Sequence, residues 1–160
     1  MIFVTIGSMF PFDRLVQAMD DWAAANPGQD ILAQIGAGAY EPRHMRWVRK
    51  LDRAEYDATV AGAQIVVAHA GVGSVVTAGE LGKPIVILPR RAHLGEHTSD
   101  HQLETVGWLR GKPGVHIAET EADLPALVAA ALAQGPGEVG RIGPVADPAF
   151  IARLRAFILR

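Results

Sequence analysis

The sequence carries one glycine-rich turn of the kind that can bind a phosphate group. A short apolar, β-branched run at residues 65–68 is typical of a strand covered on both faces of a parallel sheet. Gly71 and Gly73 follow and let the backbone turn sharply beside a ligand. Ser74 stands where a helix is expected to begin, with free backbone N–H groups and the positive end of the helix dipole. Such a turn can hold a diphosphate, or it can join strand to helix and bind nothing.

The usual motifs of nicotinamide, flavin and ATP sites are missing from the sequence. The first predicted turn has Gly7 alone, and Val76 stands where the later turn would need a third glycine. No G-x-x-x-x-G-K-[S/T] segment and no Asp-x-Asp pair occur, which argues against a nucleotide diphosphate held by a carboxylate-bound metal. A diphosphate site here would therefore use backbone amides, the helix dipole and cations such as Arg90 and Arg91.

A competing motif, His93-x-x-Glu96-His97, matches a zinc-protease pattern. That chemistry needs a stable helix to bring both imidazoles to one face. Pro89 precedes the motif and Gly95 interrupts it, so the segment is expected to be a loop. A metal-dependent hydrolase therefore stays a minor alternative, and no metal ligand is assigned.

Alternating strand and helix patterns position these residues. Strands are predicted at residues 2–6, 31–35, 65–68, 84–88 and 115–118, and helices at 12–25, 52–61, 74–81, 99–109, 121–133 and 148–160, with Thr120 as an N-cap. This alternation predicts a doubly wound parallel α/β sheet. Ligands bind such sheets outside the carboxyl ends of the strands, so the loops at 7–8, 69–74 and 89–102 are expected to converge on one crevice.

Length and composition indicate one globular domain spanning residues 1–160. The formal net charge of −2 gives no global reason to expect nucleic-acid binding. The absence of cysteine excludes disulfides and favours a reducing cytoplasm. Residues 1–7 are predicted to form a strand rather than a signal peptide, and the uncharged run at 58–79 is interrupted by glycines, so any membrane contact is expected to be peripheral. Residues 43–50 form a basic segment, helical or extended, that is either a solvated face or a surface for an anionic partner.

Several ordered motifs together resemble the C-terminal, donor-binding half of family 28 glycosyltransferases. They are Phe3-Val4-Thr5-Ile6-Gly7, His69-Ala70-Gly71-x-Gly73-Ser74, Leu81-Gly82-Lys83-Pro84 and Asp100-His101-Gln102. The opening segment is similar to stand-alone versions of that domain, such as the cytosolic catalytic subunit of the dolichol-linked GlcNAc transferase. Leu88-Pro89-Arg90-Arg91 with Gly95-Glu96-His97 resembles bacterial exopolysaccharide transferase subunits more closely. The resemblance extends from Met1 to about Leu132.

The resemblance implies the Rossmann-like half of a GT-B enzyme. The implied function is the donor-binding, catalytic subunit of a two-subunit inverting transferase that moves a sugar from a UDP-sugar to a lipid-linked acceptor in polysaccharide biosynthesis, without a cofactor. The other half would be a membrane-anchored partner subunit that binds the acceptor and holds this chain at the inner face of the membrane. Whether the chain self-associates without that partner is left open, as are the sugar and the acceptor.

The resemblance also assigns substrate-binding residues. Gly7 and Ser8 would line the diphosphate, and the glycine-rich turn would cradle it. The full set is Gly7, Ser8, His69, Gly71, Gly73, Ser74, Thr77, Arg90, Asp100 and Gln102. Asp100 and Gln102 would reach the sugar hydroxyls, although Asp100 can equally be a helix N-cap, and His69 can equally be a turn histidine satisfied by backbone.

Two departures qualify this assignment. Family members often carry an acidic residue, which holds the ribose, where this chain has Thr77; Thr77 would bind a ribose hydroxyl less strongly. No general base with a matched partner is evident, so the catalytic residue is unknown and the base is expected on the acceptor-binding partner. These departures motivate an alternative, a non-catalytic accessory subunit that activates or stabilises a partner transferase. The predicted helix at 148–160 either docks on the partner or packs on its own sheet.

Overall fold

A computed structural model of the chain describes residues 1–135. The predicted terminal helix at 148–160 lies outside the described residues.

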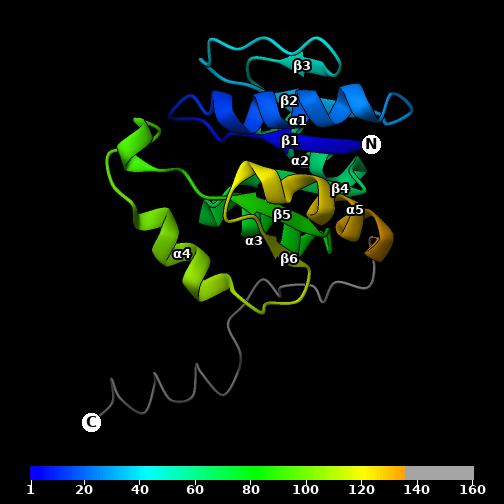
Figure 1. The fold of residues 1–160 in the computed structure, drawn as a ribbon. Coiled ribbons are helices and arrows are strands. Elements are labelled where there is room, and N and C mark those ends of the chain that lie inside the picture. The colour runs from blue at the N-terminus through cyan, green and yellow to red at the C-terminus, as the bar shows by residue number, and fades with distance from the viewer. Residues whose placement is uncertain (136–160) are drawn as a thin grey trace.

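Within the described residues, one parallel sheet forms the centre of the molecule (Figure 1). Its strands are β1 (Ile2–Thr5), β2 (Ile31–Gln34), β3 (Arg46–Val48), β4 (Ile65–His69), β5 (Ile85–Leu88) and β6 (Val115–Ile117). They are ordered β3-β2-β1-β4-β5-β6, and Ile2 of β1 pairs with Ile31 on one side and Ile65 on the other. The predicted doubly wound parallel α/β sheet is confirmed. The strand order reverses between β1 and β4, where such sheets bind their ligands.

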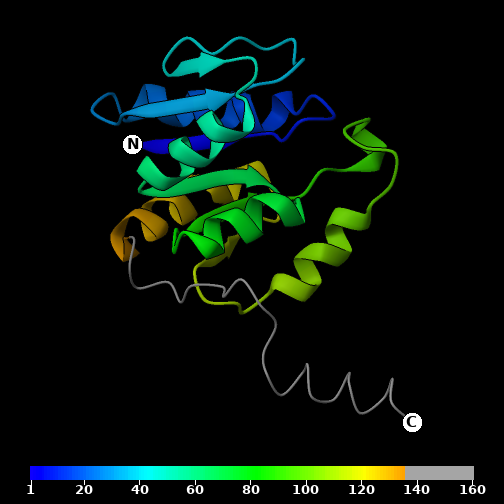
Figure 2. The same cartoon turned by 180° about the vertical axis from the view of Figure 1, so that it is seen from behind.

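Helices cover both faces of the sheet. The helices are α1 (Asp13–Ala25), α2 (Arg53–Gly62), α3 (Val72–Glu80), α4 (His101–Leu109) and α5 (Leu124–Gln134), with short 3₁₀ turns η1 (Ala92–Leu94) and η2 (Glu121–Asp123). Helices α1 and α5 lie on one face (Figure 1), and α2 and α3 lie on the other, with α4 extending away from α3 (Figure 2). Two apolar cores result, one on each side of the sheet.

The buried strands explain the apolar runs of the sequence. Every residue of β1 is buried, and Val66 and Val67 of β4 are also fully buried although they point to opposite faces. Helix α1 turns Leu15 and Met19 to the sheet, as its predicted apolar stripe requires. The residues that form the core are therefore those that the apolar runs and the helical stripe of the sequence predict.

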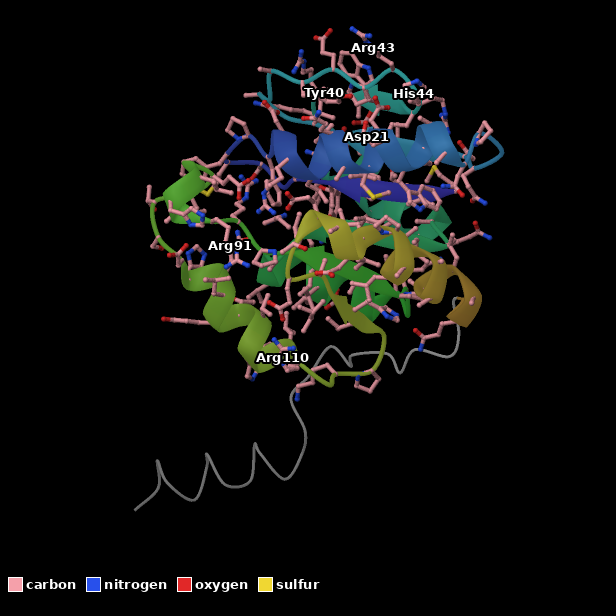
Figure 3. All side chains as sticks on the ribbon, in the orientation of Figure 1. Asp21, Tyr40, Arg43, His44, Arg91 and Arg110 are labelled. Carbon is pink, nitrogen blue, oxygen red and sulfur yellow. The ribbon has the colours of Figure 1, made fainter. Side chains whose placement is uncertain are left out.

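Strand β3 lies in the basic segment, which is extended rather than helical. Arg46 pairs with Asp30 at 2.7 Å, and Arg49 pairs with Glu41. The loop before β3 is held against α1, where Tyr40, Arg43 and His44 gather in Figure 3, because the backbone N–H groups of Arg43 and His44 donate to the buried Asp20. Much of the basic charge is thus neutralised within the fold, which favours the solvated face over an anion-binding surface.

Some helix boundaries differ from those predicted. Helix α3 begins at Val72 instead of residue 74, and α4 begins at His101 instead of residue 99. The helix predicted at 121–133 divides into η2 and α5 behind Thr120, whose N–H donates to Asp123 Oδ2 at 2.9 Å as part of a capping box. Among the described residues, no helix combines the length and apolar character needed to cross a bilayer.

Candidate donor-binding cleft

A cleft of about 490 Å³ opens at the carboxyl ends of β1 and β4. The three predicted loops meet there, since Gly7, His69 and Gln102 all line it. Parallel strands bring the loops that follow them to the same edge of the sheet, and the reversal of strand order leaves a gap between those loops. The cleft is therefore a consequence of the topology, and its chemistry depends on the side chains and amides that face it.

The N-terminus of α3 is open toward this cleft. Gly71 is its N-cap residue and has no side chain to bond the first amides. The N–H groups of Val72, Gly73 and Ser74 lie in the first turn, where no earlier helical carbonyl is available to them. A Cβ added at Gly73 would meet no heavy atom within 4 Å, so the space beside this glycine is open. Free amides and the helix dipole are the groups with which helix N-termini bind anions.

The imidazole of His69 lies between two glycine turns. A Cβ at Gly7 would approach His69 Cε1 to 2.7 Å, and a Cβ at Gly71 would overlap His69 Nε2. Gly7 also has a φ of +75°, which L side chains rarely adopt. The two glycines are therefore needed for the histidine to fit, in addition to the turns that they make.

Burial, and to a lesser extent the charge of Arg90, lowers the pKa of His69 to about 4. The imidazole is neutral at pH 7 and adds no positive charge to the cleft. Its Nδ1 atom is buried and has no hydrogen-bond partner among residues 1–135. The backbone of Thr5 also acts on the ring and raises its pKa against these effects, so the geometry is compatible both with a turn histidine held by backbone and with a ligand or water contact.

Arg90 joins the loop after β1 to the loop after β5. The residue is 2% exposed, and its guanidinium carbon lies 4.8 Å from the ring centroid of Phe12. It donates to four backbone carbonyls, those of Ile6, Phe10, Pro11 and Glu96. Burial lowers the pKa of Arg90 to about 10, so the group stays charged at pH 7. Arg90 lines the cleft as predicted, but its charge is held by carbonyls and it positions the loops.

Gln102 and Asp100 occupy different environments at the start of α4. Gln102 is buried, lines the cleft, and its Oε1 accepts from the N–H of Arg90 at 3.0 Å. Asp100 does not line the cleft; its Oδ1 accepts from the N–H of Ala92 at 2.8 Å, and its side chain makes no cap bond to α4. The structure thus brings Gln102 to the site and leaves Asp100 supporting η1.

The remaining predicted residues all lie on the cleft. Ser74 and Thr77 face it from α3, each 7% exposed, and Ser8 faces it from the loop after β1. The hydroxyl of Tyr56 lies 3.4 Å from Ser74 Oγ. The structure therefore brings together every predicted site residue except Asp100.

Sequence reasoning missed the side of the cleft formed by the start of α2. Leu51, Asp52, Arg53 and Tyr56 line the cleft there. They follow β3, so the signal that could have found them is the strand itself: recognising β3 would have placed residues 51–53 at the carboxyl edge of the sheet. Asp52 caps α2, with Oδ1 accepting from the N–H of Glu55 at 2.8 Å.

Two further imidazoles lie at the mouth of the cleft. The ring of His97 stacks edge-on between Phe10 and His101, at centroid distances of 4.9 and 4.4 Å. Desolvation, followed by His101 and Arg90, lowers the pKa of His97. The rest of the zinc-like motif is engaged elsewhere: Glu96 binds Arg14 through two hydrogen bonds of 2.7 and 2.8 Å and accepts from the N–H of Arg91. The motif therefore builds a loop, and residues 1–135 bring no three His, Asp or Glu side chains together in a metal-binding group.

Comparisons with known proteins agree with this geometry. The family model of the glycosyltransferase family 28 C-terminal domain matches residues 1–132. The glycotransferase of kitacinnamycin aligns with a TM-score of 0.63 and 20% identity, over 97% of this chain and 37% of that one. Glycosyltransferase SsfS6 of Streptomyces sp. SF2575, complexed with thymidine diphosphate, aligns with a TM-score of 0.53 and 17% identity, over 97% and 35%. UGT73P12 of Glycyrrhiza uralensis aligns with a TM-score of 0.54 and 15% identity, over 99% and 35%.

At these identities the structural likeness shows the fold alone, and it confirms the predicted Rossmann-like half of a GT-B glycosyltransferase. The chain spans little more than a third of the length of each of these relatives. No curated protein matches the chain. The family match, in contrast, spans nearly all of the described residues and every loop of the cleft. The chain belongs to the family of the glycosyltransferase family 28 C-terminal domain.

Proposed function

We propose that this chain is the donor-binding, catalytic half of an inverting glycosyltransferase that uses a UDP-sugar. The observation that carries the proposal is the uncapped N-terminus of α3, where Gly73 and Ser74 line the cleft. The complex of SsfS6 with thymidine diphosphate supports a nucleoside diphosphate donor. The diphosphate would lie at α3, and the nucleobase would lie toward Leu51 and Tyr56 at the start of α2.

The mechanism follows from where charge develops. As the bond between sugar and diphosphate breaks, negative charge grows on the leaving group. The first amides of α3 are fixed in place by the helix, so they would stabilise that charge more in the transition state than in the bound donor. Neutral His69 offers its ring beside the same anion without the desolvation cost of a second charge. Gln102 would bond the donor sugar, since it lines the cleft and its Oε1 is held by the N–H of Arg90.

The acceptor side requires a second body. The chain corresponds to little more than a third of the length of its structural relatives, so most of each relative has no counterpart in it. We propose a membrane-anchored partner subunit that binds a lipid-linked acceptor in polysaccharide biosynthesis, supplies the general base and holds the chain at the inner face of the membrane. The predicted helix at residues 148–160 is the proposed docking element.

Calorimetric titration of the full chain with UDP, UDP-glucose, UDP-GlcNAc and UDP-glucuronate, with and without magnesium, tests the donor assignment. We expect metal-independent binding that Gly73→Asp abolishes, because a carboxylate at this position repels the diphosphate. Gly107→Asp in α4 is the matched control, since a Cβ there also meets no heavy atom within 4 Å. The UDP-sugar that binds most tightly identifies the donor.

The accessory-subunit alternative predicts a different result. A cleft that has lost the ability to bind a donor would not bind UDP or UDP-sugars even at millimolar concentration. Repeating the titration with the partner present separates a cleft that needs its partner to form from one that never binds. Absence of binding in both cases would contradict the catalytic assignment and favour an accessory role.

A further inference from the structure

A second hollow, the α3–α4 slot, lies on the helical face that α2 and α3 cover. Its volume is about 280 Å³. Its walls include Val72, Val75 and Val76 of α3 and Trp108 and Leu109 of α4, and Ile85 of β5 forms part of its floor. Figure 2 shows that α4 diverges from α3, and the slot is lined by residues of both helices.

The slot gathers unusually exposed apolar side chains. Five large apolar side chains stand out as exposed among residues 1–135, and three of them line the slot: Val72 at 53%, Val76 at 37% and Trp108 at 66%. Exposed apolar side chains that gather around one hollow, rather than lying scattered, are typical of a small interaction site. No described residue covers it. The slot is therefore expected to bind an apolar group.

The charged rim of the slot is cationic. Among the described residues, its charged lining side chains are Lys83 and Lys112. Lys112 Nζ lies 5.7 Å from the ring centroid of Trp108, and Lys83 Nζ donates to the carbonyls of Ala61 and Ala63. Arg110, at the same end of α4 (Figure 3), pairs with Glu119 at 2.6 Å. The ligand that complements this rim is apolar along its length and anionic at one end.

The volume of the slot bears on the class of ligand. An α-helix with side chains is about 10 Å across, so it would place single side chains in a hollow of about 280 Å³ and would not enter it whole. A cavity of about 150 Å³ holds a benzene ring, so this slot has room for a chain of roughly ten carbon atoms. Tryptophan beside lysine is also the pair that proteins place at the boundary between headgroups and acyl chains. These features favour a lipid chain over a protein segment.

We propose that the α3–α4 slot takes one acyl chain of an anionic phospholipid at a bilayer surface, with the lipid phosphate at Lys112 and Trp108 at the headgroup boundary. The lipid stays intact and no covalent step is involved. Val72 lines the slot and its neighbour Gly73 lines the cleft, so a bilayer at the slot lies alongside the donor site. The role of this contact rests on the proposed function, because the proposed lipid-linked acceptor lies in the same bilayer. The lipid binding itself does not depend on that function.

The test measures Trp108 fluorescence in the full chain, isolated as the difference between the wild type and Trp108→Phe. Vesicles of phosphatidylcholine with about 30% phosphatidylglycerol are expected to shift this emission to the blue, because anionic surfaces attract the lysine rim. Phosphatidylglycerol brominated in its acyl chains is expected to quench it. Vesicles of phosphatidylcholine alone should bind at least tenfold more weakly.

Matched variants test the site itself. Val76→Asp and Lys112→Glu should each weaken vesicle binding tenfold or more, whereas Leu94→Asp and Lys50→Glu, which make the same changes outside the slot, should stay within twofold. Equal losses in both pairs would show unspecific adsorption and overturn the proposal. So would an unquenched Trp108, or a Trp108 already shielded from acrylamide in the lipid-free chain, because the chain itself or a second copy would then fill the slot.

Failure here is distinguishable from failure of the proposed function. UDP titration of the same samples reports on the cleft alone, and Lys112→Glu should leave the UDP affinity within twofold of the wild type. A chain that binds UDP but gives no vesicle response keeps its donor assignment and loses the lipid site. A chain that responds to vesicles but ignores UDP keeps the lipid site and loses the donor assignment.

Discussion

The guanidinium of Arg90 donates a hydrogen bond of 2.6 Å to the carbonyl of Ile6, which lies 84 positions earlier in the chain. Three more carbonyls share the same guanidinium, two from the loop after β1 and one from the loop after β5. These four hydrogen bonds hold together the two loops that flank the cleft. The backbone N–H of Arg90 also donates to Gln102, so this one residue connects the loop after β1, the loop after β5 and the start of α4.

Arg90→Lys is therefore expected to destabilise the fold. Lysine keeps the charge but cannot reach four carbonyls in one plane, so buried acceptors lose their donors at a cost of about 2–4 kcal/mol in total. Urea unfolding measures the loss. Arg91→Lys, whose side chain donates to the carbonyl of Glu119, is the control and should cost less than about 1 kcal/mol. Unchanged stability with lost UDP binding would instead make Arg90 a direct diphosphate ligand.

The contact between His69 and Gly71 predicts a coupled pair of mutations. Gly71→Ala should cost about 2 kcal/mol or more in unfolding free energy, because the added Cβ overlaps the imidazole. In a His69→Ala background the same substitution should cost less than about 1 kcal/mol. Gly73→Ala, where no atom lies within 4 Å, serves as the control. Additive effects in the double mutant would show that the ring does not fill this space.

The buried imidazole also predicts how stability depends on pH. The pKa of His69 is about 4 in the folded chain and about 6.5 in an unfolded one, so only the unfolded chain takes up this proton at intermediate pH. The resulting stability is complete above about pH 6.5 and is lost as the pH falls toward about 4, by at most about 3 kcal/mol. Urea unfolding from about pH 7.5 to 4.5 should show this slope in the wild type and a shallower one in His69→Asn. Parallel slopes would contradict the lowered pKa.

Thr77 offers a test of where the ribose lies. A carboxylate at this position should accept hydrogen bonds from ribose hydroxyls more strongly than a hydroxyl does, so Thr77→Glu is expected to tighten UDP binding by about tenfold. Thr77→Gln has a similar shape without the charge and should change the affinity by less than about threefold. Calorimetric titration with UDP, and with inorganic diphosphate, which lacks the ribose, measures the change in affinity. If Thr77→Glu weakens UDP and diphosphate equally, the carboxylate faces the diphosphate and the ribose lies elsewhere.

Much of the fold could be predicted because the buried strands display it. β1 and β4 are short runs of apolar residues between turn signals, and the stripe of α1 follows the helical period. Strand β3 could not be recognised in the same way. It is an edge strand of three residues with exposed Arg46 at its start, so its sequence has the polarity of a surface segment.

The site could be predicted in part for a related reason. Local turn chemistry identifies the loops at Gly7 and Gly71, and the parallel topology then brings them together. The sequence alone could not show that the guanidinium of Arg90 donates to carbonyls far away in the chain. Nor could it show that the Asp100 side chain accepts from Ala92 and does not line the cleft. Both depend on how two loops far apart in the chain pack against each other.

The most direct test of the donor cleft is a titration of the ¹⁵N-labelled full chain with UDP, followed through its backbone amide resonances. We expect saturable shifts that are largest for Gly7, Ser8 and the first turn of α3 at Val72, Gly73 and Ser74. Amides at the opposite edge of the sheet, such as Ile31, should not move. Saturable binding whose largest shifts lie outside the cleft, or no shifts in a folded chain with its partner present, would contradict the central claim.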